Sequence, residues 1–360
     1  MTTYYTKEHW KELNEKYPRE SIINRLITEI LNGKIEYPIK KITYEECIES
    51  FVGLQNYKCN PVFTGDVYSR YEYKYPLSGR YIDEVNSFND ASNYFHQENR
   101  WKCDSINSPS PYRTWNNEKF LRTLLPALWS MKVEEITDQS LRMIIGMRKY
   151  IASQFKPTVA KSIYEKYNSR NVLDFSAGWG DRFAGFCACE NTNSYVGIDP
   201  NVNLHHGYMA QAQDYNVSKT SYFVEGGAED VVNPVFDTFT YDTIFTSPPY
   251  FDVERYTRDS NQSWKKYKKL NDWLNGFLFK TLNRYWEQLS PNGHLIINIS
   301  DVYAHHTVNK ICDPMNDFIS TLPNAEFVEG LGMKMAKRPN SKAVRTDGVF
   351  VEPIWIWRKI

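Results

Sequence analysis

Short apolar runs separated by amphipathic stretches make up the second half of the chain. The apolar runs have the length and composition of buried strands, and they cover residues 171–175, 194–199, 221–224, 241–245 and 294–299. The stretches between them carry apolar residues at helical spacing, as Phe183, Ala184 and Phe186 do. This alternation predicts an α/β fold with a doubly wound sheet. Two last runs, residues 327–335 and 349–357, predict an antiparallel strand pair that closes the sheet.

The first part of the chain lacks this alternation. Residues 1–115 are rich in Tyr, Asn and Pro and contain loop signals such as the one at residues 76–79. Leucine and isoleucine then recur at helical spacing in residues 121–151, which predicts core-forming helices. The sequence therefore predicts an N-terminal mixed region over residues 1–115, a candidate for target recognition, and an α/β domain with a helical lead-in over residues 116–360.

The overall charge does not favour nonspecific binding to nucleic acid. The 360 residues include 43 basic and 43 acidic side chains, so there is no general basic field. One segment late in the chain has five basic residues and no acid: Lys334, Lys337, Arg338, Lys342 and Arg345. A basic loop of this kind can hold a phosphate backbone, or it can be a solvated charged hairpin, and both interpretations stay open.

The cysteine and histidine patterns argue against a metal site. None of the six cysteines forms a C-x-x-C pair, which makes zinc and disulfide frameworks improbable. The tandem pairs His205-His206 and His305-His306 do not favour chelation, because adjacent side chains on a helix or strand point apart. No apolar run reaches transmembrane length and no signal-peptide core is visible, so we expect an intracellular, cytoplasmic protein in a cell or an infected host.

Residues 171–182 predict a strand, a glycine turn and the start of a helix. Gly178 and Gly180 let the backbone turn tightly and approach a ligand without a Cβ in the way. The third glycine of a dinucleotide-binding fingerprint is missing, because Phe183 occupies its position. Instead Asp174 precedes the glycines by four residues. A carboxylate at this point can bind an ammonium group, which S-adenosylmethionine has and NAD lacks.

Two further strand ends carry acids. Asp199-Pro200 ends the second strand, where an acid can bind both ribose hydroxyls of a nucleoside. Glu229-Asp230 follows the third strand, from which it can reach the adenine ring or its amine. Each acid alone can equally be a helix cap or a solvated turn. In this order and at this spacing, the acids favour a nucleoside site.

The tetrapeptide Ser247-Pro248-Pro249-Tyr250 follows the strand at residues 241–245. The two prolines have fixed φ angles and no N–H, so the backbone leaves the strand stiffly and its carbonyls are available as acceptors. Ser247 adds a side-chain acceptor and Tyr250 a flat ring. This set suits a planar base with an exocyclic amine. The alternative is a proline-rich turn that merely ends a strand.

Taken together, the motifs resemble those of the S-adenosylmethionine-dependent DNA amino-methyltransferases, which methylate the exocyclic amine of adenine or cytosine. The similar segments are Asp174-Phe175-Ser176-Ala177-Gly178-Trp179-Gly180 for the cofactor motif, Asp199 for the ribose-binding acid, Glu229-Asp230 for the adenine side, and Ser247-Pro248-Pro249-Tyr250 for catalysis. The resemblance covers about residues 165–360. It implies a Rossmann-like methyltransferase sheet, S-adenosylmethionine as cofactor, DNA as partner and no metal.

The resemblance also implies a mechanism. Hydrogen bonds from the amine to the Ser247 side chain and the Pro248 carbonyl favour a pyramidal nitrogen, whose lone pair then faces the cofactor's methyl group. In a duplex the base must first be flipped out, and Tyr250 stacks on it. The family has Asp, Asn or Ser at the first position of the motif. The Ser form is similar to many cytosine-N4 enzymes, so the sequence favours cytosine N4 over adenine N6.

Other functions remain open. The motifs also fit methylation of a base amine in RNA, or of a protein glutamine amide, although enzymes of the latter kind use Asn in place of Ser247. A third alternative is an inactive nucleoside-binding subunit. Strands and helices fill the interval between Gly180 and Ser247, so target recognition is expected in residues 1–115, 251–270 and 334–345. The aromatic and basic residues in the first of these segments suit either base stacking or an ordinary core: Trp101, Tyr112, Arg113 and Trp115.

Overall fold

The computed structural model describes residues 2–215, 217–232, 236–336 and 347–360. The chain forms two compact units. Unit 1 contains residues 1–41, 98–153 and 254–257, and unit 2 contains residues 42–97, 154–253 and 258–360. The predicted boundary after residue 115 falls inside unit 1, while residues 42–97 of the expected N-terminal region lie in unit 2.

Unit 1 is a small helical unit with its own core. Its elements are β1 (Thr3–Tyr5), α1 (Lys7–Lys16), α2 (Arg19–Leu31), β5 (Asp104–Ser105), α5 (Pro111–Trp115), α6 (Glu118–Leu124), α7 (Ala127–Ser130), β6 (Ile136–Thr137), α8 (Asp138–Arg148) and β11 (Glu254–Arg255). The leucines and isoleucines of residues 121–145 are buried in this core, which confirms that they form core helices. Trp101 and Trp115 are buried there as well, so these two rings are core residues and not a stacking surface.

Unit 2 holds a large mixed sheet. Its strands are β2 (Phe63–Thr64), β3 (Val67–Tyr68), β4 (Leu77–Ile82), β7 (Asn171–Asp174), β8 (Ser194–Asp199), β9 (Thr220–Glu225), β10 (Tyr241–Thr246), β12 (Leu289–Asn298), β15 (Ala325–Lys334) and β16 (Val349–Lys359). Their order is β2-β4-β15-β16-β12-β10-β7-β8-β9, and β3 pairs with β16. Strands β12, β10, β7, β8 and β9 run parallel, whereas β16 is antiparallel to both β12 and β15. The predicted doubly wound sheet with a closing antiparallel pair is confirmed.

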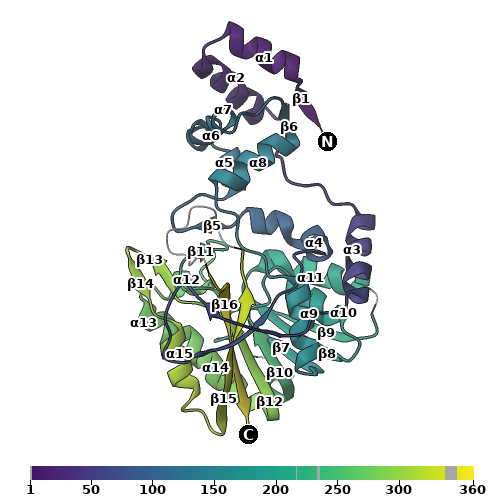
Figure 1. Cartoon of the computed structure of the whole chain (residues 1–360), viewed down its shortest axis with the longest axis vertical. Coiled ribbons are helices and arrows are strands. Elements are labelled where there is room, and N and C mark those ends of the chain that lie inside the picture. Colours follow the sequence, from purple (N-terminus) through teal and green to yellow (C-terminus); the bar gives the residue numbers. More distant parts are fainter. Residues whose placement is uncertain (1, 216, 233–235, 337–346) are drawn as a thin grey trace. The chain divides into compact units, whose positions relative to one another are not determined.

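Helices cover both faces of this sheet, because its central strands are apolar on both sides (Figure 1). Val172 and Phe245 point to one face and Leu173 and Ile244 to the other, as the alternation of side chains along a strand requires. The first face packs on α3 (Tyr44–Asn56), α9 (Pro157–Lys166) and α10 (Asp181–Ala188). The second packs on α13 (Leu270–Trp273), the π-helix Leu274–Phe279, α14 (Lys280–Gln288) and α15 (Cys312–Ile319).

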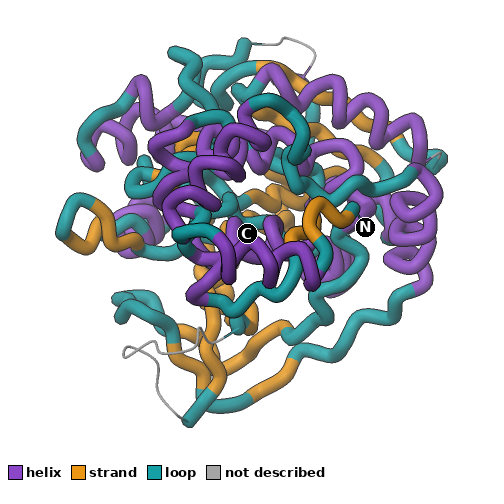
Figure 2. Tube along the Cα trace, turned by 90° about the horizontal axis from the view of Figure 1, so that it is seen from above, coloured by secondary structure: helices purple, strands orange, loops and turns teal. Residues whose placement is uncertain are grey.

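The remaining elements lie around the sheet. They are α4 (Asp90–Trp101), which begins in unit 2 and ends in unit 1, and, within unit 2, α11 (Val202–Tyr215), the 3-10 helix Phe236–Thr238, α12 (Ser263–Lys266), β13 (Val302–Ala304) and β14 (Thr307–Asn309). Strands β13 and β14 form a hairpin of their own. This hairpin projects from unit 2 at the left of the view in Figure 1 and again in the view from above in Figure 2.

One sequence prediction about the sheet was wrong. Residues 76–79 were expected to form a loop, but Leu77–Ile82 is strand β4, which extends the sheet beyond β15. Gly79 has a φ of +76°, so the glycine that signalled a loop is a local irregularity within the strand. Pairing with β15, about 250 residues away in sequence, overrides the local turn signal.

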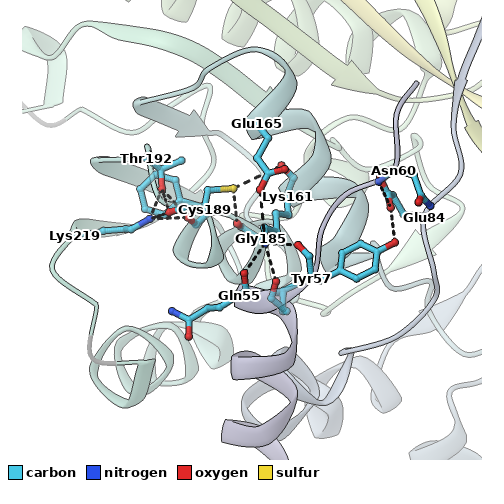
Figure 3. A network of polar contacts seen from close by, with 12 residues as sticks. Gln55, Tyr57, Asn60, Glu84, Lys161, Glu165, Gly185, Cys189, Thr192 and Lys219 are labelled. Atoms are coloured by element: carbon cyan, nitrogen blue, oxygen red, sulfur yellow. Dashed lines mark hydrogen bonds and ion pairs between the residues drawn. The ribbon is translucent and has the colours of Figure 1, made fainter. Parts of the chain in front are cut away.

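Two lysines, the buried Lys161 and the half-buried Lys219, hold the ends of helices on the first face of the sheet (Figure 3). The Nζ atom of Lys161 donates to the carbonyls of Leu54, Gln55 and Tyr57 at 3.0, 2.8 and 2.7 Å, where α3 ends. Lys219 donates to carbonyls at the end of α10 in the same way, one of them that of Phe186 at 3.2 Å. The last carbonyls of a helix have no intrahelical partner, so a buried cation satisfies them and complements the helix dipole.

We expect the substitution Lys161→Met to lower the free energy of unfolding by about 2–3 kcal/mol, because hydrogen bonds from a charged donor to buried carbonyls are lost. Urea denaturation followed by circular dichroism measures the change. The matched control is Lys166→Met on the same helix, since the ammonium group of Lys166 lies 5.2 Å from the ring centroid of Tyr167. Equal losses in the two variants would contradict the capping role of Lys161.

Candidate active site

The predicted site residues lie at one edge of the sheet. Strands β7, β8, β9, β10 and β12 are parallel, so their carboxyl ends meet at the same edge. Asp174 ends β7, Asp199 ends β8, and Ser247 directly follows β10. In open α/β sheets this edge is where ligands bind. The fold thus brings together residues that are more than 70 positions apart in the sequence.

The glycine turn between β7 and α10 adopts a conformation that requires glycine. Gly178 and Gly180 have φ angles of +60° and +73°. A Cβ at Gly180 would lie 2.3 Å from the side-chain oxygen of Gln211, so a side chain has no room there. The turn is tied to β8, since the Gly178 amide donates to Asp199 Oδ2 at 2.9 Å and the Ala177 amide to the Ile198 carbonyl at 3.0 Å.

Asp174 is fully buried and is engaged within the protein. Its carboxylate accepts from Arg182 Nε at 2.7 Å and Nη2 at 3.2 Å, and from the Tyr195 hydroxyl at 2.9 Å. Arg182 also donates to the Ser176 carbonyl. The neighbouring side chains of Phe175 and Ala177 are buried as well. Asp174 therefore holds the glycine turn in place, and direct binding of an ammonium group stays a prediction.

Two residues that support the glycine turn, Gln211 and His96, could not be predicted from the sequence. Gln211 on α11 donates to the Gly180 carbonyl at 3.0 Å, and its oxygen lies 3.1 Å from Nε2 of His96 on α4. Burial lowers the pKa of the His96 imidazole to about 4, so the ring is neutral at physiological pH. His96 comes from the part of the chain where the sequence shows no motif, which is why only the structure places it here.

Asp199 is the acid at the tip of β8, and it is buried. Its carboxylate accepts from the amides of Asn201 and Gly178, both at 2.9 Å. Burial raises the pKa of this carboxyl group to about 6, although the two amide hydrogen bonds lower it. The adjacent Pro200 carbonyl accepts from the Asn261 side chain at 2.8 Å. The chain that follows the catalytic turn therefore reaches back to the end of β8.

Glu229 and Asp230 differ in their surroundings. Lys266 donates to Glu229 Oε1 at 2.7 Å and to Asp230 Oδ2 at 2.8 Å. Glu229 is buried, and its Oε2 atom has no hydrogen-bond partner among the described residues. Asp230 is exposed, and hydrogen bonds from Lys266 and Lys280 lower the pKa of its carboxyl group. Of this pair, Glu229 is the residue with an acceptor that a ligand donor can fill.

The turn after β10 is linked to two further strands. The Ser247 hydroxyl donates to Asn298 Oδ1, at the end of β12, over 3.4 Å. Asn298 in turn donates to the Pro353 carbonyl at 3.0 Å, and to Glu352 on β16 at 3.4 Å. Burial and the charge of Glu352 raise the pKa of the Tyr250 phenol well above its usual value, so this hydroxyl stays protonated.

Asn298 and Glu352 were not predicted as site residues. Asn298 lies in a run of otherwise apolar strand residues, so a lone polar residue near the end of a buried strand was the available signal. Nothing local marks Glu352. Of the predicted basic loop, Lys334 pairs with Asp83 at 2.6 Å, while Lys337, Arg338, Lys342 and Arg345 lie outside the described residues.

A comparison with known families identifies this half of the site. Residues 241–359 match the family model described as DNA methylase, of the N6/N4 type. The match covers about a third of the chain, and this segment is similar to DNA methylases. The matched region includes the turn at residues 247–250 together with Asn298 and Glu352. The match supports S-adenosylmethionine as the cofactor of this chain.

The chain is also similar to solved structures. TrmN from Thermus thermophilus is 14% identical, covers 57% of this chain and 49% of its own, and has a TM-score of 0.38. A rRNA methylase from Streptococcus thermophilus is 11% identical, with 58% and 99% covered and a TM-score of 0.36. This chain thus spans about half the length of the first protein. Similarities at this level do not identify a substrate, and no curated protein matches the sequence.

Within the described residues, no group of three or more His, Cys, Asp or Glu side chains is arranged to hold a metal ion. Methyl transfer from a sulfonium centre needs no metal, because the donor itself is a strong electrophile. The described part of the chain also has no helix that is both long and apolar enough to cross a membrane.

We expect the affinity for S-adenosylmethionine to fall as the pH drops below about 6. Asp199 is predicted to accept from the ribose hydroxyls as a carboxylate, and burial raises the pKa of this group to about 6. Below that pH the free protein is protonated at Asp199, and binding must release the proton, so affinity falls about tenfold per pH unit. Calorimetry between pH 5 and pH 8 measures the effect. Asp199→Asn should bind weakly at every pH, and an unchanged pH profile in this variant would contradict the assignment.

Proposed function

We propose that the enzyme transfers the methyl group to the exocyclic amine of a base in DNA, with cytosine N4 favoured over adenine N6. The observation that carries the proposal is the Ser247-Pro248-Pro249-Tyr250 turn at the carboxyl edge of the sheet, beside the glycine turn and Asp199. Ser247 in place of Asp or Asn resembles the cytosine-N4 enzymes. The remaining steps follow from the contacts of these residues.

The cofactor side of the proposal uses backbone and acid groups. Asp199 accepts from the ribose hydroxyls, and the Gly178–Gly180 backbone leaves room for the amino-acid part because no Cβ intrudes. Glu229 Oε2, the buried acceptor without a partner among the described residues, accepts from the adenine amine. Once bound, the cofactor supplies an electrophilic methyl group on a sulfonium centre. Asp174 positions the glycine turn through Arg182.

The acceptor side uses the proline turn. Ser247 donates its own proton to Asn298, which leaves the lone pairs of Ser247 Oγ available for a proton of the base amine. The Pro248 carbonyl accepts the second amine proton. With both protons held, the nitrogen lone pair can face the methyl group, and this positioning supplies most of the rate advantage. Tyr250 stacks on the flipped base. As the carbon–nitrogen bond forms, the methyl–sulfur bond would break with its electron pair on sulfur, and the methylated amine would lose one proton to solvent.

DNA recognition is proposed for the segments outside this core. Residues 1–115 and 251–270 are the described candidates, because the interval between the glycine turn and Ser247 is filled by the elements β8, α11, β9 and β10. In residues 251–270 the half-buried Lys265 and the exposed Lys268 each place an ammonium group within 5.2 Å of the Trp264 ring centroid. Basic and aromatic groups in such proximity suit contacts to phosphate and base.

The base choice is tested by the product. Nucleosides from DNA methylated by the purified enzyme are analysed by mass spectrometry, with a Ser247→Ala preparation as the control. The expected product is N4-methylcytosine. N6-methyladenine alone would overturn the choice of cytosine and leave the amino-methyltransferase assignment standing. A methylated base found in RNA, and not in DNA, would overturn the DNA substrate.

The roles of the turn are tested by two variants. Tyr250→Ala should lose about 1–3 kcal/mol of base stacking, seen as a weaker affinity for DNA that carries the target base. Ser247→Ala should lower the rate of methyl transfer with little effect on binding. Both variants should keep the affinity for S-adenosylmethionine measured by calorimetry, because their contacts are to the acceptor. Unchanged methyl transfer in both variants would show that this turn does not hold the acceptor.

A further inference from the structure

Residues with positive φ angles lie on both sides of the hydrogen bond between His305 and Asp252, close to the turn at residues 247–250. Among the described residues, eight that are not glycine have a positive φ, and three of them are Phe251, His305 and His306 at +57°, +52° and +62°. Three of the other five are Asn, which tolerates this conformation, as His does too, whereas a bulky Phe adopts it rarely. Strain of this kind persists only where the surroundings enforce it, and it concentrates at functional sites.

The two histidines form the tip of the β13–β14 hairpin. A two-residue hairpin turn in which both residues have positive φ normally carries Asn-Gly, Asp-Gly or Gly-Gly. In this chain the positions are His305 and His306, between Ala304 and Thr307. The turn geometry alone does not select histidine over Asn, Asp or Gly, and the His305 side chain makes a contact that those residues could not make in the same way.

That contact is with the segment that leaves the catalytic turn. Nε2 of His305 lies 2.7 Å from Oδ2 of Asp252, two residues after Tyr250. Asp252 is buried, with 9% of its surface exposed, whereas the His305 side chain is 54% exposed. Between Tyr250 and Asp252 lies Phe251, whose ring is buried against Trp273. The exit of the turn is therefore held on both sides, by packing at Phe251 and by His305 at Asp252.

The hairpin is firmly attached at its base. Asp301, just before β13, is buried and accepts from the amides of Ile311 and Cys312 at 2.7 and 2.9 Å, just after β14. The Asn309 side chain donates to the Ala304 carbonyl at 3.2 Å and so fixes the hairpin from inside. The hairpin begins four residues after Asn298, which holds Ser247. One segment, residues 298–305, thus contacts both the start and the exit of the catalytic turn.

We propose that His305 is a positioning residue, which fixes the catalytic turn through Asp252 so that the Ser247 hydroxyl and the Pro248 carbonyl face the base amine. This role rests on the proposed function of the turn. The proposed role of His305 is to act through Asp252 and not through a contact with the acceptor or the methyl donor. A shift of about 1 Å in the acceptor groups can cost roughly a hundredfold in rate, so a contact of this kind matters for catalysis.

The two histidines provide a matched pair of variants. His305→Asn keeps a residue that tolerates the turn conformation and removes the contact with Asp252. His306→Asn makes the same change one position along and leaves that contact intact. We expect His305→Asn to lower kcat about 10- to 100-fold while KM and the affinity for S-adenosylmethionine change little. His306→Asn should keep the activity of the unaltered enzyme. Equal activity in the two variants would overturn the proposal.

Asp252→Asn provides the second half of the test. It should lower kcat at least as much as His305→Asn does, and the double variant should be no worse than Asp252→Asn alone, because His305 acts through Asp252. Additive losses would show that the two side chains act independently and would overturn the proposal. A fall in Tm that parallels the fall in kcat across these variants would assign the hairpin to stability alone.

A measurement that needs no substrate can test the positioning role of His305 separately from the proposed methylation of DNA. The Phe251 amide donates to the Pro249 carbonyl at 3.0 Å, and the Val253 amide donates to the Tyr250 carbonyl at 3.3 Å. Hydrogen exchange of these two amides reports the conformation of the turn whatever the enzyme methylates. Exchange should be faster in His305→Asn than in His306→Asn. Equal exchange in both variants would overturn the positioning role, whereas faster exchange with no base methylation in any protein would overturn only the proposed function.

Discussion

The buried ion pair between Asp174 and Arg182 is the interaction on which the rest of the site depends. Two buried charges are costly to desolvate, so such a pair is tolerated only where good geometry and further hydrogen bonds satisfy both groups. Here Arg182 meets the carboxylate with two nitrogens and also donates to the Ser176 carbonyl, while Tyr195 donates to the same carboxylate. The pair thereby joins β7, the glycine turn, α10 and β8. Replacing either partner would leave a charge buried without compensation.

Because that pair fixes the glycine turn, the turn can organise its neighbours. The Gly178 amide helps to hold the Asp199 carboxylate, whose burial raises its pKa to about 6. A carboxylate kept in this state is a strong acceptor for hydroxyl groups, since the protein supplies only part of its hydrogen bonds. The neutral His96 beneath the turn supports Gly180 through Gln211 without adding a charge. The glycine turn therefore determines both the position of the Asp199 carboxylate and part of its hydrogen bonding.

The sequence predicted the parts of the fold whose signals are local. Strand β8 coincides with its predicted range, and the glycine turn and the proline turn lie at the predicted edge of the sheet. It failed where long-range packing decides the outcome. Strand β4 pairs with β15 across about 250 residues, and His96 reaches the glycine turn from α4. The exchange of segments between the two units was also not predictable, because no change of composition marks residues 42, 98 or 254.

The segment after the catalytic turn links these parts along the chain. Asp252 is held in unit 2 by His305, and only two residues later Glu254 belongs to unit 1, where β11 pairs with β5. There the Glu254 carboxylate accepts from the hydroxyls of Tyr150 and Tyr256. The chain then returns to unit 2, where Asn261 reaches Pro200 and Lys266 reaches Glu229. The segment that follows Tyr250 thus includes strand β11 of unit 1. It also contacts Pro200 and Glu229 at the carboxyl edge of the sheet. Within unit 1 this segment is fixed by its pairing with β5, and the parts before and after it are fixed by contacts within unit 2.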